Sequence, residues 1–194
     1  MRDLSQYGEY TLLKNYFIEE IPRHKIIVDV GARGFSLSNS LNFIIDLKWR
    51  GLLVEPYKES HLELCKKLKD ENVVVVNAAI SDYSGDGKLY HHKIAGHHSL
   101  LNKTEQYEVC KIYTLPELLK DNSIPEDFDI LTVDAEGMDE RIIKFMFEKS
   151  NYRPRIILHE KNNGKLFSEL FIKYSYNLIY ETRGNGIYEK RRDK

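Results

Sequence analysis

Glycine and acidic residues accompany two short apolar runs in the first third of the chain, at a spacing that suits the binding of a nucleoside. The run at 25–30 contains Asp29 and leads into Gly31, and the run at 51–54 leads into Glu55. A glycine turn between a strand and a helix lets backbone N–H groups approach a ligand closely. An acid at the end of the next strand can accept hydrogen bonds from both hydroxyls of a ribose. The pattern predicts cofactor contacts at Asp29, Gly31, Ala32, Arg33, Gly34, Glu55 and Pro56.

The composition of this glycine turn narrows the choice of cofactor. The turn has only Gly31 and Gly34, so it does not match the G-x-G-x-x-G fingerprint of dinucleotide-binding proteins. Asp29 would repel a diphosphate, whereas it would attract a cofactor that carries an ammonium and a sulfonium. The turn therefore favours S-adenosylmethionine over a dinucleotide. The alternative is an ordinary turn in a Rossmann-like domain that binds no ligand.

The segment after a third apolar run, at 73–76, is placed to contact an adenine ring. Ala78 and Ala79 are small enough for a flat ring to approach, and Asp82 could accept a hydrogen bond from the exocyclic amine. We therefore predict Ile80, Ser81 and Asp82 on the adenine side. Small residues also simply let a loop pack, so both interpretations stay open.

Acids and a histidine follow the two later apolar runs. The run at 128–133 precedes Asp134 and Glu136, and the run at 155–158 precedes His159 and Glu160. Ligands of open α/β sheets bind at the carboxyl ends of the strands, so we expect these groups to share one rim with Asp29. Loops are polar in any case, but several titratable groups on one rim indicate a functional site.

The remaining pattern predicts the elements that position these residues. Apolar residues at helical spacing predict helices at 4–21, 37–47, 57–69, 115–120, 139–147 and 165–173. Strands are expected at 25–30, 51–54, 73–76, 108–114, 128–133, 155–158, 176–181 and 186–189. The last two are too close for a parallel crossover and should form an antiparallel hairpin. Residues 77–82 are expected to leave the sheet, and 83–87 to form a turn.

The segment 88–104 is the least regular part of the chain and contains His91, His92, His97 and His98. A metal site is the least favoured interpretation, because adjacent histidines on a strand point to opposite faces and no carboxylate has matching local spacing. We therefore predict no metal. A substrate-facing segment with one functional histidine, or a solvated polar loop, is favoured instead.

Composition excludes several classes of protein. A length of 194 residues suits one domain with a full core, and a net charge of −1 gives no field that would attract nucleic acid or an anionic membrane. No apolar segment is long enough to span a bilayer, and the N-terminus lacks the apolar core of a signal peptide. Cys65 and Cys110 have no metal-ligand spacing and are expected to be reduced. A cytoplasmic location is expected by default.

A series of motifs runs in order along nearly the whole chain: Ser5-Gln6-Tyr7-Gly8-Glu9, Asp29-Val30-Gly31-Ala32, Ser38-Asn39-Ser40, the stretch from Trp49 to Pro56, Asn77-Ala78-Ala79-Ile80, Val133-Asp134-Ala135-Glu136-Gly137 and His159-Glu160. Together they resemble the FkbM-type methyltransferases. The resemblance is closest to the branch that opens with Ser-Gln-x-Gly-Glu-Asp and carries Ser-Asn-Thr after the glycine turn. Tyr10 stands where that branch usually has an acid, and Ser40 where it has threonine.

The resemblance implies a Rossmann-like class I methyltransferase fold. Its mostly parallel seven-stranded sheet would have helices on both faces and end in a C-terminal antiparallel hairpin. We expect a single domain over 1–194, with a helical segment at 1–22 before a Rossmann-like core at 23–194. The implied cofactor is S-adenosylmethionine, and the implied reaction is methyl transfer to a hydroxyl of a sugar or other small-molecule or glycan acceptor.

The chemistry of that reaction suggests roles for the acids on the rim. Methyl transfer is an in-line displacement, so the protein must hold the donor and the acceptor oxygen in line. An alcohol acceptor also needs its proton removed by a carboxylate, a histidine or a metal-bound oxygen. Asp134 is the first candidate for acid–base catalysis or acceptor positioning, with Glu136, His159 and Glu160 as supporting candidates.

Three other functions remain open. A nicotinamide-dependent enzyme is disfavoured by the turn and by the C-terminal hairpin. A catalytically silent binding module is disfavoured by the acids on the rim. A nucleic-acid methyltransferase is disfavoured by the neutral charge and by the absence of a basic, aromatic-laced stripe. The sequence shows neither the acceptor nor the oligomeric state.

Overall fold

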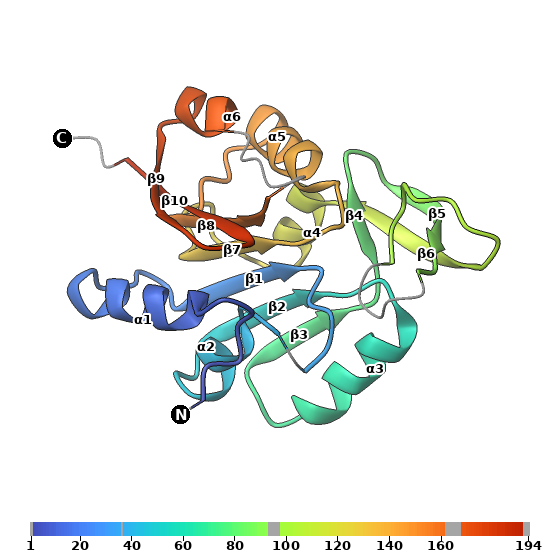
Figure 1. Ribbon diagram of the computed structural model, residues 1–194, viewed down its shortest axis with the longest axis horizontal. Helices are drawn as coiled ribbons and strands as arrows, with labels where there is room; N and C mark the ends of the chain where they lie inside the picture. Colours follow the sequence, from blue (N-terminus) through green and yellow to red (C-terminus); the bar gives the residue numbers. More distant parts are fainter. Residues whose placement is uncertain (1, 36, 93–97, 162–167, 192–194) are drawn as a thin grey trace.

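A computed structural model describes residues 2–35, 37–92, 98–161 and 168–191. Its main element is a seven-stranded sheet with the strand order β3-β2-β1-β7-β8-β10-β9 (Figure 1). The strands are β1 (Ile26–Val30), β2 (Arg50–Val54), β3 (Val73–Val76), β7 (Ile130–Val133), β8 (Ile156–Glu160), β9 (Tyr176–Glu181) and β10 (Asn185–Lys190). The predicted Rossmann-like class I fold is confirmed.

The direction of the strands follows the prediction. Strand β1 pairs in parallel with β2 and β7, β2 pairs in parallel with β3, and β7 pairs in parallel with β8. Strand β10 is antiparallel to β8 and to β9, so the sheet ends in the expected C-terminal antiparallel hairpin. The carboxyl ends of β1, β2, β7 and β8 therefore meet at one edge of the sheet.

Helices cover both faces of this sheet (Figure 1). Helices α1 (Glu9–Glu19), α2 (Leu41–Ile45) and α3 (Lys58–Lys67) supply Leu13, Phe43 and Leu64 to the core on one face. Helices α4 (Leu115–Asp121), α5 (Asp139–Lys149) and α6 (Ser168–Lys173) supply apolar side chains to the core on the other face. The expected helix at 165–173 extends partly outside the described residues.

Two helices begin later than the sequence pattern predicts, because left-handed backbone or polar side-chain contacts precede them. Gly8 has a φ of +86° and precedes the first residue of α1. Leu37 has a φ of +61°, and the Ser38 hydroxyl oxygen accepts the N–H groups of Ser40 and Leu41, so α2 begins only at Leu41. These polar contacts compete with helical hydrogen bonds.

A second sheet is the main departure from the prediction. Its strands β4 (Ala79–Ser81), β5 (Gly85–Tyr90) and β6 (Tyr107–Thr114) have the order β4-β6-β5. The expectation that 83–87 is only a turn, and that irregular structure begins at Lys88, was wrong. Strand β6 pairs in parallel with β4 and antiparallel with β5. The eight-residue β6 thus provides the hydrogen-bonding partner for two strands whose own sequences only weakly indicate a strand.

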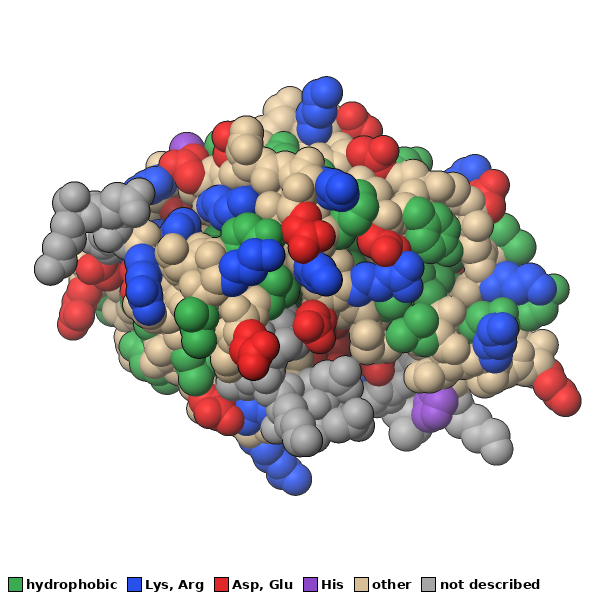
Figure 2. Space-filling model, turned by 90° about the horizontal axis from the view of Figure 1, so that it is seen from above, with side chains coloured by type: hydrophobic (Ala, Val, Ile, Leu, Met, Phe, Trp, Pro, Cys, Tyr) green, Lys and Arg blue, Asp and Glu red, His purple; other side chains and the backbone are tan. Residues whose placement is uncertain are grey.

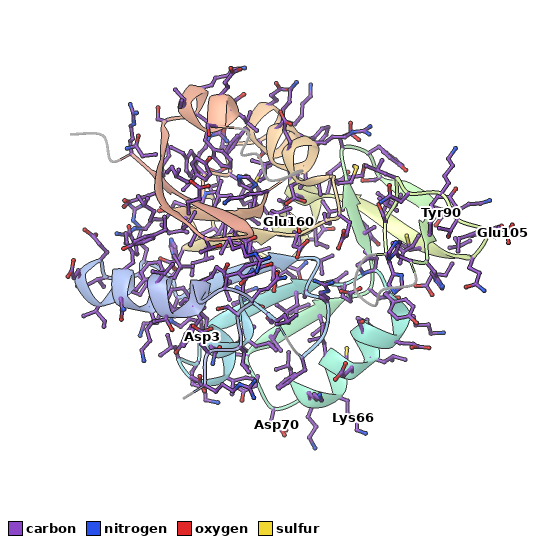
Figure 3. The ribbon with its side chains drawn as sticks, viewed as in Figure 1. Asp3, Lys66, Asp70, Tyr90, Glu105 and Glu160 are labelled. Atoms are coloured by element: carbon purple, nitrogen blue, oxygen red, sulfur yellow. The ribbon has the colours of Figure 1, made fainter. Side chains whose placement is uncertain are left out.

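No helix in the described part of the chain is long and apolar enough to cross a membrane. On the face seen in Figure 2, acidic and basic side chains are interspersed. Figure 3 places Glu160 at the centre of the molecule, near the carboxyl ends of the parallel strands, whereas Tyr90 lies out on the second sheet.

Candidate functional site

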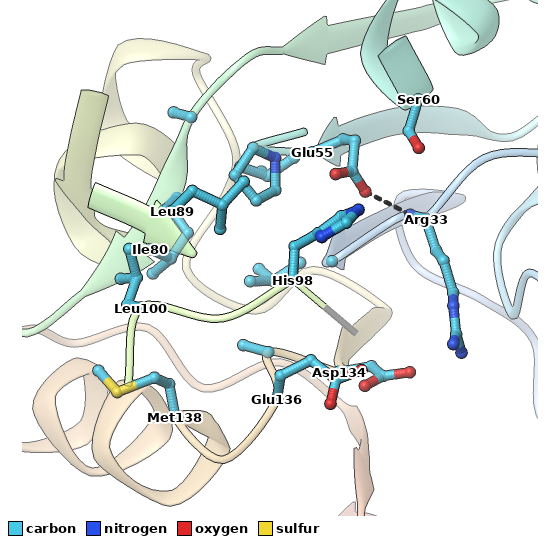
Figure 4. Close-up of a pocket in the computed structure, with 17 residues that line it drawn as sticks. Arg33, Glu55, Ser60, Ile80, Leu89, His98, Leu100, Asp134, Glu136 and Met138 are labelled. Carbon is cyan, nitrogen blue, oxygen red and sulfur yellow. Dashed lines mark hydrogen bonds between the residues drawn. The ribbon is translucent and has the colours of Figure 1, made fainter. Parts of the chain in front are cut away.

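A cleft of about 630 Å³, with its open mouth included, lies at the carboxyl ends of β1, β2 and β7 (Figure 4). Ligands of open α/β sheets bind at this end of the strands. Its lining combines backbone from the strand ends with side chains from both sheets. The lining residues are Val30, Gly31, Arg33, Val54, Glu55, Pro56, Ser60, Ala78, Ala79, Ile80, Leu89, His98, Leu100, Asp134, Ala135, Glu136 and Met138.

The glycine turn forms the floor of this cleft. The N–H groups of Gly31 and Ala32 donate to the carbonyl oxygen of Val54 at 2.9 and 3.1 Å, which joins the turn to the end of β2. Gly31 has a φ of +84°, and a Cβ at this position would collide with the carbonyl oxygen of Asp134. Glycine is therefore required both for the backbone conformation and for close contact between the ends of β1 and β7.

Glu55 presents a buried carboxylate at the end of β2. Its Oε2 accepts the N–H of Arg33 at 2.6 Å, and its Oε1 accepts the N–H of Tyr57 at 2.7 Å. Burial raises the pKa of Glu55 to about 7, although these two hydrogen bonds oppose the shift. The side chain is thus held in one position, lines the cleft and changes its charge near neutral pH.

Asp29 lies below the glycine turn and does not line the cleft. It is 4% exposed, and the Ser40 hydroxyl donates to its Oδ2 at 2.5 Å. Burial, against the opposing hydrogen bond from Ser40 and with a smaller contribution from the charges of Asp134 and Glu55, raises the pKa of Asp29 to about 7. Asp29 therefore does not contact a ligand in the cleft directly, but its charge interacts with Asp134 and Glu55, which line it.

Asp134 and Glu160 form a carboxyl pair across the ends of β7 and β8. Burial, followed by the charges of Asp134 and Glu136, raises the pKa of Glu160 to about 7. A side-chain hydrogen bond with Asp134 also raises this pKa, since two carboxyl groups can hydrogen-bond only when one carries a proton. Asp134 and Glu136 line the cleft, and Glu160 lies behind them.

Asp139, in the first turn of α5, holds the two strand ends together. Its Oδ1 accepts the N–H of Ala135 at 2.9 Å, and its Oδ2 accepts the N–H of Glu160 at 3.1 Å. Burial raises the pKa of Asp139 well above its ordinary value. Analysis of the sequence missed this residue, because the acids in the first turn of a helix usually only complement its dipole.

His159 points away from the cleft, into the core on the side of α6. Its ring stacks on Phe171 and Tyr188 with centroid distances of 5.3 and 5.6 Å, and its side chain is fully buried. Nδ1 lies 2.7 Å from the carbonyl oxygen of Glu160. Burial lowers the pKa of His159 to about 4, so the imidazole is neutral at physiological pH.

The residues predicted on the adenine side separate in the structure. Ile80 lines the cleft, whereas Ser81 is buried in β4. The Ser81 hydroxyl donates to Asp82 at 3.1 Å, and the other carboxylate oxygen of Asp82 pairs with Arg141 at 2.7 Å. Ala32 and Gly34 also lie outside the lining, beside Gly31.

Several lining residues have no sequence signal of their own. Ser60, Leu89, Leu100 and Met138 come from four different segments and meet only in the folded chain. His98 also lines the cleft, and the histidine-rich segment was the one hint of its presence. His97 lies outside the described residues, within which no cluster of potential metal ligands is found.

The electrostatics of the site favour a positively charged ligand. Glu55, Asp134 and Glu136 line the cleft, and Arg33 is the one lysine or arginine among the described lining residues. The positive charge of Arg33 lowers the pKa values of Glu55 and Glu160, but burial outweighs this effect for both. A cation near these acids would therefore be stabilised.

Comparisons with known proteins identify a matching family and a shared fold. A family model described as Methyltransferase FkbM domain matches residues 29–175. A search of curated proteins finds no significant match.

Solved structures show a similar fold at low sequence identity. A methyltransferase FkbM from Methylobacillus flagellatus KT has a TM-score of 0.55 and 14% identity, over 96% of this chain and 48% of that one. The chain thus spans about half the length of that protein. A putative methylase from Haemophilus influenzae has a TM-score of 0.52 and 15% identity, over 94% and 88% of the two chains. A precorrin-6y C5,15-methyltransferase from Geobacter metallireducens GS-15 has a TM-score of 0.52 and 14% identity, over 100% and 93%.

Proposed function

The chain belongs to the FkbM methyltransferase family, and from this premise we propose that it methylates a hydroxyl group of a sugar or other small-molecule or glycan acceptor with S-adenosylmethionine. The observation that supports the cofactor best is the set of acids at the carboxyl ends of β2, β7 and β8, with Arg33 in the same lining. S-adenosylmethionine carries a sulfonium, an ammonium and a carboxylate, so its charges complement this set.

The residues of the cleft fit the parts of this cofactor. Glu55 is fixed by two backbone hydrogen bonds and retains lone pairs for the two ribose hydroxyls. Gly31 admits the methionine portion close to the backbone, and Arg33 is placed for its carboxylate. Ala79 and Ile80 offer an apolar surface to the adenine. When bound, the cofactor supplies a methyl group on an electron-poor sulfur.

Asp134 is the proposed base for the acceptor hydroxyl. It lines the cleft from the end of β7, and its hydrogen bond with Glu160 orients its carboxyl group. Glu160 carries a proton for part of the time near pH 7 and can share it with Asp134. Glu136 lies beside them in the lining and is proposed to position the acceptor. His159 supports Glu160 from the core, since its Nδ1 contacts the Glu160 carbonyl oxygen.

The acidic lining also bears on the class of acceptor. A neutral polyol can donate hydrogen bonds to Asp134 and Glu136, whereas a phosphate group near the same carboxylates would be repelled. This supports a sugar-like acceptor over nucleic acid.

The cofactor assignment is tested by calorimetric titration of the protein with S-adenosylhomocysteine, with NADH as the control. We expect micromolar binding of S-adenosylhomocysteine and none of NADH. Binding of NADH alone would contradict the proposal. Binding of neither ligand would favour the silent module instead.

The acceptor is then sought with methyl-labelled cofactor and a panel of sugars, small phenols and RNA. We expect label to pass to a sugar hydroxyl, and Asp134→Asn to lower the rate at saturating cofactor by about 100- to 10,000-fold. Glu140→Gln is the matched control, since Glu140 is an exposed acid in the next helix. Label on RNA alone would refute the proposed acceptor class.

A further inference from the structure

His98 reaches the cleft from outside the seven-stranded sheet. Figure 4 shows its side chain extending between Glu55 and the turn that contains Asp134 and Glu136. The same lining includes apolar residues from the second sheet and its connections, with Leu89 from β5 and Leu100 two residues after the histidine. The second sheet therefore supplies a wall to a site whose acids come from the first.

The neighbour of His98 is held in place on two sides. Ser99 and Tyr90 exchange backbone hydrogen bonds of 2.9 and 3.1 Å, which joins this segment to the end of β5. The Ser99 hydroxyl donates to the carbonyl oxygen of Glu136 at 3.3 Å, which joins it to the turn after β7. His98 is thus attached to both sheets at the point where they border the cleft.

The orientation and charge of the imidazole are also determined by its neighbours. Its ring lies 4.3 Å from the ring of Tyr57, centroid to centroid, and 5.2 Å from that of His91. Its Nδ1 accepts the N–H of His92 at 3.1 Å, so Nε2 carries the hydrogen of the neutral ring. Burial and the charge of His91 lower the pKa of His98, which keeps the ring neutral at pH 7.

Tyr57 connects this ring pair to the acid that would bind a ribose. Its N–H donates to Glu55 Oε1 at 2.7 Å, and its side chain packs on His98. His98 lines the same cleft as Glu55, Leu89 and Leu100, and the Tyr57 ring supports its imidazole there. A flat, uncharged aromatic group is the chemistry that such a wall would accommodate.

We propose that His98, supported by the ring of Tyr57, packs against the adenosine portion of S-adenosylmethionine and forms part of the wall at the nucleoside end of the cleft. This inference rests on the proposed function, because it names a further binding residue of the same site. Stacking between an aromatic side chain and a base depends on the ring face, so phenylalanine should replace histidine here, whereas alanine should not.

The test uses calorimetry with two ligands that share the nucleoside, S-adenosylhomocysteine and 5′-methylthioadenosine. We expect His98→Ala to weaken both by about five- to fiftyfold, and His98→Phe to keep both within about threefold of wild type. His24→Ala is the control, since His24 is exposed and precedes β1 at the opposite end of that strand. The melting temperature of each ligand-free variant shows whether the fold is retained.

The outcomes separate this inference from the proposed function. If wild type binds neither ligand, the proposed function fails and the inference fails with it. If wild type binds both and His98→Ala binds them equally well, only the inference is overturned. A loss for S-adenosylhomocysteine without a loss for methylthioadenosine also overturns it, because the contact would then be with the amino-acid portion. Retained binding with slower methyl transfer overturns it as well, and would assign His98 to the acceptor.

Discussion

Binding of an adenosine ligand should release protons, because Glu55 must be ionised to accept the ribose hydroxyls. Burial raises the pKa of Glu55 to about 7 in the ligand-free protein. Both of its oxygens already accept backbone N–H groups, so the carboxylate cannot turn away from the cleft. A hydroxyl donor stabilises the ionised form, and a ligand that prefers one protonation state shifts the equilibrium toward it.

The size of the effect follows from this pKa. With a pKa near 7, about a tenth of the Glu55 side chains are ionised at pH 6 and about nine tenths at pH 8. If only the ionised form binds, affinity rises about tenfold over this interval, and binding at pH 7 releases about half a proton per ligand. Loss of two hydrogen bonds to a charged group in Glu55→Gln should weaken binding by about ten- to hundredfold.

5′-Methylthioadenosine is the appropriate probe, since it has the ribose but neither the ammonium nor the carboxylate that would interact with other acids. We would titrate it at pH 6, 7 and 8, and at pH 7 in phosphate and in Tris, whose different ionisation enthalpies reveal the number of protons released. Wild type should show stronger binding at higher pH and a buffer-dependent heat. Glu55→Gln should show weaker binding and neither dependence.

An affinity that stays flat from pH 6 to 8, with equal heats in both buffers, would refute the assignment of Glu55 to the ribose. A pH dependence that persists in Glu55→Gln would show that another group carries it. Glu160 is then the next group to examine, because its pKa is also raised to about 7.

Three further predictions concern the elements around the site. Gly31→Ala should lower the free energy of unfolding, measured with urea, by about 2 kcal/mol or more beyond the loss in Gly8→Ala. Both glycines have a positive φ, but of the two only Gly31 would place its Cβ against backbone atoms. Equal losses in the two variants would contradict this reasoning. Glu9→Ala should cost about 2 to 4 kcal/mol, since buried Glu9 accepts hydrogen bonds from Tyr7, Thr182 and Asn185, whereas exposed Glu19→Ala should cost less than about 0.5 kcal/mol. Burial raises the pKa of Asp29 to about 7, so the folded protein binds more protons than the unfolded protein at mildly acidic pH. The free energy of unfolding should therefore fall as pH rises from about 4 to 7. Asp29→Asn should flatten this pH dependence, and an unchanged dependence would exclude Asp29 as its source.

The strands of the main sheet and its C-terminal hairpin were predictable because the buried strands have a distinctive composition. Strands β1, β2 and β7 are apolar runs followed by glycine or acids, and β9 and β10 are too close for a crossover. The second sheet was not predictable in this way. Strand β4 has three residues, and β5 begins with Gly85-Asp86-Gly87, a sequence typical of a turn. Both become strands by pairing with β6, which is a tertiary interaction.

The same distinction applies to the site. Gly31, Glu55 and Asp134 immediately follow strands, and the carboxyl ends of parallel strands meet at one edge, so their convergence could be inferred from the sequence. His159 illustrates the limit of that rule, because it lies within β8 next to Glu160 and alternate residues of a strand face opposite sides. The place of His98 in the cleft could not be inferred, because it depends on the second sheet, whose strands β4 and β5 had no clear sequence pattern.

The raised pKa values of the buried acids link folding of this protein to binding. Asp29, Glu55 and Glu160 are each held in positions where burial opposes their ionised forms, so the ligand-free protein loses stability as pH rises toward neutrality. A cation bound among them would favour ionisation and offset that loss. Replacement of the acids by amides should then stabilise the ligand-free protein near pH 7 while weakening cofactor binding. A site of this kind is selected for the stability of its complex, and this explains why several acids remain in a region where neutral side chains would fold more readily.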